Sequence, residues 1–357
     1  MKEKTIVKRK IFISLVNYKA VDLTINCIES ICNSLQSCNV FVSVNIYCCD
    51  VSEDESKTFK ETNLRLHKLG FKALCGDEFM YQKNGRSVFF NHHRKPNLGF
   101  GYGNNRNFEK IKAEASENDI IWILNNDTLI GVHSLSEIEA AFKLDDSVIY
   151  GCTLIKESTG KIQCLGGTNE ITWRSQGSLI AENEAIESVL DSYSDINGYV
   201  NGASMLMTYD TLSQVKGFDE SYFMWCEEVD FCLRAKSLNI LFKNICKAHI
   251  VHRVGGSSEG NNIKYFLGRS SDRNTLPRFI IRYYYNYRNR IYLIRKFFPN
   301  KLIFSLMYLA SDAVTKSVGV MLYDDKKLMR LFLLLKAFND GVRNKLGKTI
   351  EPQDYNE

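Results

Sequence analysis

Apolar runs of strand length alternate with amphipathic stretches of helix length through the first 130 residues, and this alternation restricts the fold more than any other feature of the chain. Residues 11–16 have the pattern of a buried strand, and residues 23–35 repeat an apolar face at helical spacing, with Asp22 as the predicted N-cap. The same signals predict strands at residues 40–49 and 120–124 and helices at residues 57–69 and around 108–115. Strands that alternate with helices predict an α/β fold with a mostly parallel central sheet.

Polar side chains follow each of these predicted strands. Asn17 and Tyr18 follow the first strand, Asp50, Val51 and Ser52 follow the second, and Asn125, Asn126 and Asp127 follow the third. Ligands of parallel α/β sheets bind outside the carboxyl ends of the strands, so these side chains are the first candidates for a binding site. Asp127 has the chemistry to hold a cation that bridges phosphates, although a lone aspartate after a strand is also typical of a turn.

A second cluster of polar residues is acidic and surrounded by aromatic residues. Glu227, Glu228 and Asp230 follow Trp225, and Arg234 comes four residues after Asp230, a spacing that predicts an ion pair on one helical face. The first two carboxylates are predicted in the first turn of that helix. An acidic group among aromatic side chains is a candidate general base, whereas the alternative is a solvated start of an acidic helix.

Two further segments carry ligand-binding signals. His252 ends an apolar run just before a glycine-rich turn, where an imidazole can bind a metal ion. The run from Asn97 to Asn105 contains glycine at alternate positions from Gly99 to Gly103, and it predicts a tight loop that opens a helix close to a nucleotide or sugar. It lacks the strand context of a dinucleotide fingerprint and the lysine of a nucleotide-triphosphate loop.

The charge is divided unevenly along the chain. Residues 271–357 carry 16 Lys and Arg against 8 Asp and Glu, which leaves 30 against 33 for residues 1–270. The eleven cysteines are diluted over 357 residues and odd in number, which favours a reducing cytoplasm over a disulfide framework. No secretion signal is visible, and the apolar window 302–322 contains Asp312 and Lys316, so it predicts a buried helix and not a membrane span.

The stretch 277–301 is basic, aromatic and helical in pattern. One predicted face carries the apolar side chains Ile280, Tyr284, Tyr287, Ile291, Ile294 and Phe298, and the other carries Arg278, Arg282, Arg288, Arg295 and Lys296. This profile fits an interfacial helix on an anionic membrane, close to a polyprenyl-diphosphate-linked acceptor. The alternative is that the apolar face packs on the rest of the chain or on a second copy in a homodimer. No nucleic-acid-binding motif accompanies the basic charge.

Taken in order, these segments resemble family 2 glycosyltransferases, in particular the rhamnosyltransferase-like branch of bacterial surface polysaccharide synthesis. The resemblance covers residues 10–260 and rests on residues 13–18, 49–52, 97–105, 124–128, 201–204, 217–220 and 225–234, with His252 and Gly256-Ser257 at its end. It implies a GT-A fold in residues 1–265, with a donor half at about 1–130 and an acceptor half at about 131–265, followed by a helical region at 266–357.

The resemblance also implies roles for individual residues. Glu228 is the general base, supported by Asp230, and Asp127 and His252 hold a divalent cation, Mn²⁺ or Mg²⁺. The donor-side residues are Asn17, Tyr18, Asp50, Ser52, Asn97, Gly99, Asn105 and Asn126. The acceptor-side residues are Gly202, Trp225, Glu227 and Arg234. Three positions depart from the family pattern: Asn125 replaces an acidic metal ligand, Val51 replaces Asn, and Glu228 replaces the more frequent Asp.

The expected reaction is an inverting, metal-assisted transfer of a sugar from a nucleotide-diphosphate donor to a lipid-linked or growing surface glycan. One base without a covalent nucleophile implies single displacement. Resemblance to the branch favours dTDP-rhamnose. Galactosyl or glucosyl transfer from a UDP donor and a non-catalytic scaffold of the same fold are the alternatives. The expected location is the cytoplasm, peripheral to the inner face of the bacterial cytoplasmic membrane.

Overall fold

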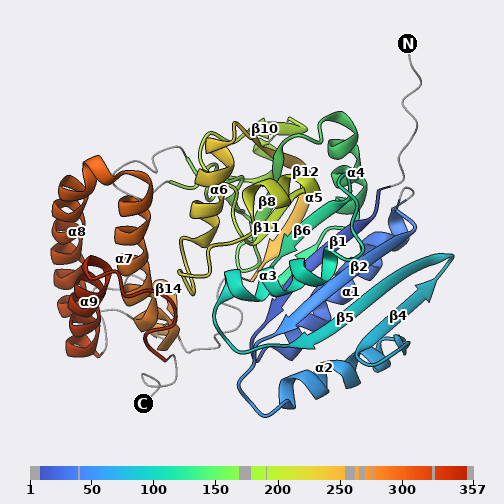
Figure 1. Cartoon of the computed structure of the whole chain (residues 1–357), viewed down its shortest axis with the longest axis horizontal. Coiled ribbons are helices and arrows are strands. Elements are labelled where there is room, and N and C mark those ends of the chain that lie inside the picture. Colours follow the sequence, from blue (N-terminus) through green and yellow to red (C-terminus); the bar gives the residue numbers. More distant parts are fainter. Residues whose placement is uncertain are drawn as a thin grey trace.

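A computed structural model describes residues 9–38, 41–168, 178–189, 191–253, 262–264, 270–274, 277–323 and 326–351 (Figure 1). The elements of the first half are β1 Ile11–Asn17, α1 Val21–Ser37, β2 Ser43–Asp50, α2 Lys57–Lys68, β3 Lys72–Ala73, β4 Glu78–Lys83, β5 Arg86–Arg94, α3 Phe100–Ile111, β6 Ile120–Leu124, β7 Thr128–Ile130, α4 Ser134–Leu144, β8 Ile149–Lys156 and β9 Ile162–Cys164. They continue with β10 Tyr193–Asp195, β11 Ser204–Thr208, α5 Tyr209–Val215, α6 Glu227–Ser237, β12 Phe242–His252, β13 Asn262–Lys264, β14 Ser270–Asn274, α7 Pro277–Phe297, α8 Leu302–Tyr323 and α9 Lys327–Val342. Short 3₁₀ turns lie at Ile186–Ser188 and Pro299–Lys301.

One twelve-stranded sheet organises the chain, in the order β10-β12-β8-β11-β6-β1-β2-β5-β4-β3, with β7 and β9 paired to β12 and β8. Its centre, β5-β2-β1-β6, is parallel throughout. β11 runs antiparallel between β6 and β8, and β12 runs parallel to β8. The predicted α/β fold with a mostly parallel core and a helical C-terminal region is therefore confirmed.

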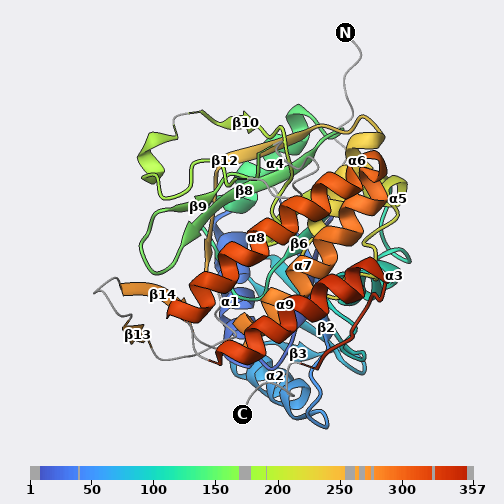
Figure 2. The same ribbon diagram turned by 90° about the vertical axis from the view of Figure 1, so that its left-hand side faces the viewer.

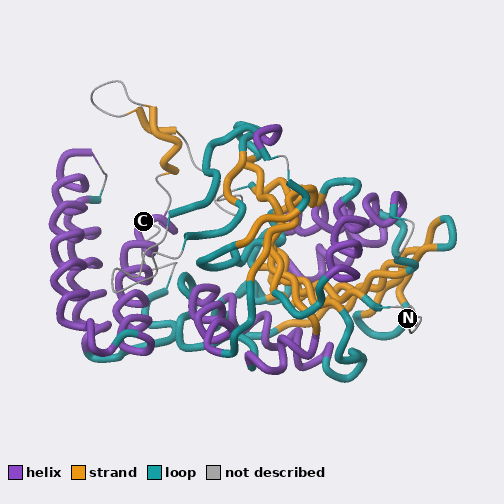
Figure 3. Tube along the Cα trace, turned by 90° about the horizontal axis from the view of Figure 1, so that it is seen from above, coloured by secondary structure: helices purple, strands orange, loops and turns teal. Residues whose placement is uncertain are grey.

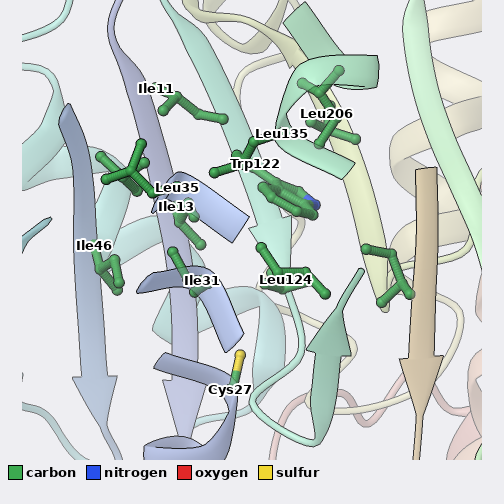
Figure 4. Close-up of a cluster of buried hydrophobic side chains, with 14 of the residues drawn as sticks. Ile11, Ile13, Cys27, Ile31, Leu35, Ile46, Trp122, Leu124, Leu135 and Leu206 are labelled. Atoms are coloured by element: carbon green, nitrogen blue, oxygen red, sulfur yellow. The ribbon is translucent and has the colours of Figure 1, made fainter. Parts of the chain in front are cut away.

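Strand β1 shows how the sequence places the core. Its side chains alternate, so that Ile11, Ile13 and Leu15 join a cluster on the α1 side, while Phe12 joins a second cluster on the opposite face. Figure 4 shows the first cluster, in which α1 side chains such as Ile31 meet Trp122 of β6. Both faces of these strands are covered, which explains why they read as continuous apolar runs.

Two local predictions need correction. Asp22 lies inside the first turn of α1, and Ala20 occupies the N-cap position without a side-chain cap. The hairpin of β4 and β5 was not predicted, because its strands mix apolar with charged and amide side chains at the sheet margin, as in Arg86–Arg94. This hairpin matters for the site, because β5 extends the parallel core by one strand beyond β2.

The C-terminal helices form a separate layer beside the sheet-containing part of the chain (Figures 1 and 3). Helix α7 lies between that part and the helices α8 and α9, and a third apolar cluster joins its Tyr284 and Ile291 to Phe223 and Leu333. The main-chain N–H of Gly347 donates to the Ser221 carbonyl, so the segment after α9 also returns to the sheet-containing part.

For the basic stretch, the alternative that its apolar face packs on the rest of the chain is confirmed, because Tyr284 and Ile291 pack with Phe223. Arg288, predicted on the basic face, is fully buried, whereas Lys296 is exposed. The side chains of Arg278 and Arg282 lie outside the described residues. Helix α8 is not buried as predicted, because Ile303, Phe304 and Met307 on its outer face are exposed. Among the described residues, no helix is long and apolar enough to cross a membrane.

Candidate active site at the carboxyl edge of the sheet

The ends of β1, β2 and β6 are joined by a buried network of polar side chains. The Asn17 amide donates to Asp50 Oδ2 at 2.8 Å, and the Ser52 N–H donates to Asp50 Oδ1 at 2.9 Å. The Asn17 Oδ1 atom accepts from the Asn126 amide at 3.1 Å and from the Thr24 hydroxyl at 3.1 Å. The network unites three residues that were predicted from different strands. Burial raises the pKa of Asp50, and the bonds from Ser52 and Asn17 oppose that shift.

Asp127 and His252 are brought together as the sequence predicted. His252 ends β12, which pairs with β7 directly after Asp127, and its Nε2 lies 3.2 Å from Asp127 Oδ1. The other ring nitrogen, Nδ1, lies 2.8 Å from the Gln163 amide oxygen. An amide oxygen accepts hydrogen bonds, so Nδ1 carries a proton, and in the neutral ring the Nε2 lone pair faces the carboxylate.

This pair has the chemistry of a partial cation site. Two acceptor atoms face one another, and Asp127 Oδ1 is buried without a hydrogen-bond partner. A proton on His252 or a divalent cation between the two groups satisfies both atoms. An imidazole and a carboxylate suit Mn²⁺ or Mg²⁺ when phosphate oxygens complete the coordination. In the described residues, no group of three or more His, Cys, Asp and Glu side chains gathers to hold a metal ion by itself.

Glu227 and Glu228 begin helix α6, as predicted, with Glu227 buried and Glu228 half-buried. Glu227 is 6% exposed, and its Oε2 atom has no hydrogen-bond partner. Burial raises the pKa of Glu227 well above its ordinary value, and the neighbouring Glu228 adds to this. Burial also raises the pKa of Glu228, which lies half-buried at the edge of the site. Carboxyl groups with raised pKa values are suited to proton transfer.

The acidic pair lies at the same sheet edge as Asp127. In the sheet register, Leu124 of β6 faces Ser204 of β11, and the next residue, Asn125, donates its N–H to the Ala203 carbonyl at 3.0 Å. Just before this, a Cβ atom on Gly202 would lie 3.3 Å from the Glu228 side chain. The segment before β11 thus packs tightly against the start of α6. This packing places the candidate base beside the segment that carries the candidate metal ligand.

A comparison with curated proteins finds one partial relative. Rhamnosyltransferase WbbL of Escherichia coli (strain K12) is 34% identical over 61 residues, which make up 17% of this chain and 23% of that protein. The chain therefore matches about a quarter of the length of this curated relative. No family model matches the chain.

Weakly similar solved structures include S. aureus TarS and GalNAc-T7. S. aureus TarS, residues 1–349, in complex with UDP-GlcNAc is 15% identical with a TM-score of 0.48, and the alignment covers 93% of this chain and 81% of that one. GalNAc-T7 with UDP, GalNAc and Mn²⁺ is 11% identical with a TM-score of 0.47, covering 70% of this chain and 44% of that one.

Asp230 and Arg234 form the predicted ion pair, but they lie beneath the site. Arg234 Nε donates to Asp230 at 2.6 Å, and its other nitrogens donate to the carbonyls of Val215 and Gly217. Asp230 is fully buried and also binds Lys296 of α7 and the Tyr222 hydroxyl. This carboxylate therefore fixes α6 to its neighbours, and its contacts with Lys296 and Tyr222 could not be predicted from sequence spacing.

The glycine run is explained by close packing and not by a phosphate loop. A Cβ atom on Gly99 would lie 2.0 Å from the Phe223 carbonyl oxygen, and one on Gly101 or Gly103 would clash with Phe218 or Val16. Asn105 bonds through both amide atoms to Phe218, and it also donates to Glu220. The run and Asn105 thus hold α3 against β1 and the 217–223 segment.

The remaining predicted residues surround these groups. Asn97 is buried just before Gly99, and Tyr18 is half-buried at the end of β1, with the Lys19 ammonium over its ring. Trp225 is half-buried and packs on the apolar cluster of α7. Sequence reasoning missed Gln163, which orients His252, and Asn289 of α7, which bonds to the main chain around Trp225. Both are single amide side chains outside any sequence motif, so their roles can be recognised only from the groups that they contact in the fold.

Proposed function

We propose that the chain is an inverting glycosyltransferase that moves a sugar from a nucleotide-diphosphate donor to a hydroxyl group of a glycan acceptor. The observation that carries the proposal is the Glu227–Glu228 pair beside the segment that bears Asp127, with Glu227 buried, Glu228 half-buried and the pKa of both raised. The partial match to a rhamnosyltransferase supports the same reaction class, and it favours dTDP-rhamnose as the donor. UDP-galactose and UDP-glucose are the alternative donors.

In the proposed mechanism, Glu228 accepts the proton of the attacking hydroxyl group. Its half-buried position leaves one side open to an acceptor, and its raised pKa makes it a stronger base than an exposed glutamate. Asp127 and His252 would hold Mn²⁺ or Mg²⁺, which supplies Lewis-acid stabilisation of charge on the departing diphosphate. Gln163 keeps the Nε2 lone pair of His252 directed at that position.

For the acceptor, we propose a lipid-linked glycan reached from an anionic membrane surface, on the inner face of the bacterial cytoplasmic membrane. The surface for this contact is the outer face of α8 and α9, here called the α8–α9 face, which Figure 2 shows in front of the molecule. It consists of Ile303, Phe304, Met307, Val314, Val318, Met321, Leu322, Leu328, Phe332 and Leu335, all exposed. All eleven cysteines are unpaired thiols, which suits a reducing compartment.

Charge at the α8–α9 face favours an anionic membrane over a second copy of the chain. The exposed charged side chains described on and around it are Lys301, Lys316, Lys326, Lys327, Arg343 and Lys345. Asp312 points inward instead, to Tyr287 and Arg290 of α7. Cations around an apolar surface attract anionic lipid headgroups, whereas two copies of this face would bring like charges together.

The direct test of the function is Glu228→Gln, with the exposed Glu187→Gln as its control. We expect Glu228→Gln to lower sugar transfer about 10²- to 10⁴-fold, because the amide cannot accept the proton, while donor binding survives. A thermal-shift panel of dTDP- and UDP-sugars, with Mn²⁺ or with chelator, identifies the donor first, and release of the nucleoside diphosphate then measures turnover. Near-normal turnover of Glu228→Gln would show that another group is the base. Absence of stabilisation by every nucleotide sugar would favour the non-catalytic scaffold.

A further inference from the structure

The segment that leads into α6 has an unusual backbone. Phe223, Trp225 and Cys226 have φ angles of 68°, 64° and 73°, in the left-handed region that favours glycine. Each such non-glycine residue costs of the order of 1–3 kcal/mol and persists only when its surroundings hold it. Cys226 is also the N-cap of α6 and has no side-chain cap, so this helix, which begins with the candidate base pair, depends on the path of the preceding main chain.

Helix α7 supplies the groups that hold this path. The Asn289 amide nitrogen donates to the carbonyl of Met224 at 2.7 Å, of Trp225 at 2.8 Å and of Tyr222 at 3.1 Å. Arg288 Nη2 donates to the Tyr222 carbonyl as well, at 2.7 Å. Both side chains are fully buried. One amide thus connects three carbonyl groups of a strained segment that is more than sixty residues away in the sequence.

The orientation of the Asn289 amide is itself fixed. Its Oδ1 atom accepts from Arg288 Nε at 2.9 Å and from Arg288 Nη2 at 2.7 Å, so the amide nitrogen must face the carbonyls. On the other side of the segment, the Phe223 carbonyl accepts the Phe100 N–H at 3.0 Å, in the close contact that requires Gly99. The strained segment is therefore held between α3 and α7.

We propose that Asn289, oriented by Arg288, is a positioning residue for the reaction: it holds the 222–226 segment in the strained conformation that aims Glu227 and Glu228 into the site. This inference rests on the proposed function for its catalytic consequence. In this proposal α7, which lies outside the sheet-containing part of the chain, positions the residues of the site. The basic, aromatic sequence pattern of α7 did not predict this role.

The test is Asn289→Asp, which keeps the shape of the side chain and its contact with Arg288 but turns an acceptor toward the three carbonyls. Asn286→Asp makes the same change one turn earlier on α7, where the side chain is half-buried, and serves as the matched control. Asn289→Ala is a second variant that removes the donor without adding charge. Hydrogen exchange, turnover of the nucleotide sugar identified in the panel and the pH profile of turnover are measured for each variant.

For Asn289→Asp and Asn289→Ala, we expect amide exchange in residues 222–230 to rise about tenfold or more, with the exchange of β1 and β6 unchanged. We expect kcat to fall about 10²-fold with a nearly constant KM for the donor, because a displaced base affects the transition state more than binding. Burial of Glu228 is expected to raise the pH at which turnover increases in the wild type. In both Asn289 variants this pH should be lower.

The outcomes separate this inference from the proposed function. Exchange, kcat and pH profile at wild-type values in both Asn289 variants would overturn the role of Asn289. If the wild-type protein turns over no nucleotide sugar, the proposed function fails, and hydrogen exchange alone decides whether Asn289 holds the segment. If Asn286→Asp reproduces the changes, the effect belongs to the charge placed on α7 and the inference is wrong.

Discussion

The spacing of carboxyl groups in the sequence does not show which of them form ion pairs in the folded chain. Glu227, Glu228 and Asp230 lie within one helical turn, yet Asp230 is neutralised by Arg234 and Lys296 while Glu227 is buried with an unpartnered oxygen. One of the two cations comes from α6 itself and the other from α7. Because an unpaired buried carboxyl group is costly, its persistence is typical of a functional site.

This cost gives a prediction for Glu227→Gln. The pKa of Glu227 is raised in the folded state, so the unfolded chain loses that proton first, and stability falls as the pH rises above about 4.5. Below that pH both states are protonated and the residue contributes nothing. We expect Glu227→Gln to be more stable than wild type at pH 7.5, because the amide is not charged when the unfolded glutamate would lose its proton.

Urea unfolding at pH 4 and pH 7.5 measures this difference. The variant and the wild type should converge at the lower pH, and Glu184→Gln, an exposed glutamate, should match the wild type at both. A variant no more stable than wild type at pH 7.5 would mean that Glu227 has a partner when charged.

Helix α3 and the glycine run at its start show how one element positions others. The sequence predicts a tight loop, and the structure shows that its glycines approach other parts of the chain closely: Gly99 to Phe223, Gly101 to Phe218 and Gly103 to Val16. Glycines at alternate positions predict that the main chain packs closely against another group, but only the tertiary structure shows which group that is. Asn105 confirms this assignment, since its amide is matched to the main chain of Phe218.

We predict that Gly99→Ala destabilises the protein by about 2–5 kcal/mol, through left-handed strain and a clash with the Phe223 carbonyl. Gly160→Ala is the control, because Gly160 has a φ of 66° but nothing within 4 Å of its would-be Cβ. The control should lose only about 1 kcal/mol. Chemical denaturation measures both values, and equal losses would show that the 222–226 segment moves aside freely.

The whole molecule distributes its exposed apolar surface unevenly. About half of the large apolar side chains exposed in the described residues lie on α8 and α9, with Leu328 81% exposed and Ile303 73% exposed. The exposed apolar surface thus lies on the two helices that follow the basic stretch 277–301, because the apolar face of α7 packs internally. An apolar patch of this kind in a folded protein marks an interaction surface.

We predict that the double variant Phe304→Asp and Phe332→Asp loses binding to phosphatidylglycerol vesicles by more than tenfold, because each buried aromatic side chain contributes about 1.5–3 kcal/mol. Leu144→Asp, an equally exposed apolar residue on α4, should bind as wild type does. Co-sedimentation measures binding, with phosphatidylcholine vesicles as the uncharged comparison. Unchanged vesicle binding of the double variant would contradict the proposal. If the wild type is a dimer and the double variant is a monomer, the α8–α9 face binds a second copy of the chain instead of a membrane.

The sequence by itself determined the alternating α/β order, the strands whose ends carry Asn17, Asp50 and Asp127, and the helix that begins at Glu227, because these depend on local periodicity and short spacings. It did not determine which polar residues face the site. Asn289, Gln163 and Lys296 have no local signal, and their roles come from groups that the fold brings to them from far along the chain. The tertiary structure also decided which C-terminal helix is buried. Apolar periodicity predicts that one face of a helix is covered, but only the packing shows what covers it and which helix keeps an exposed apolar face.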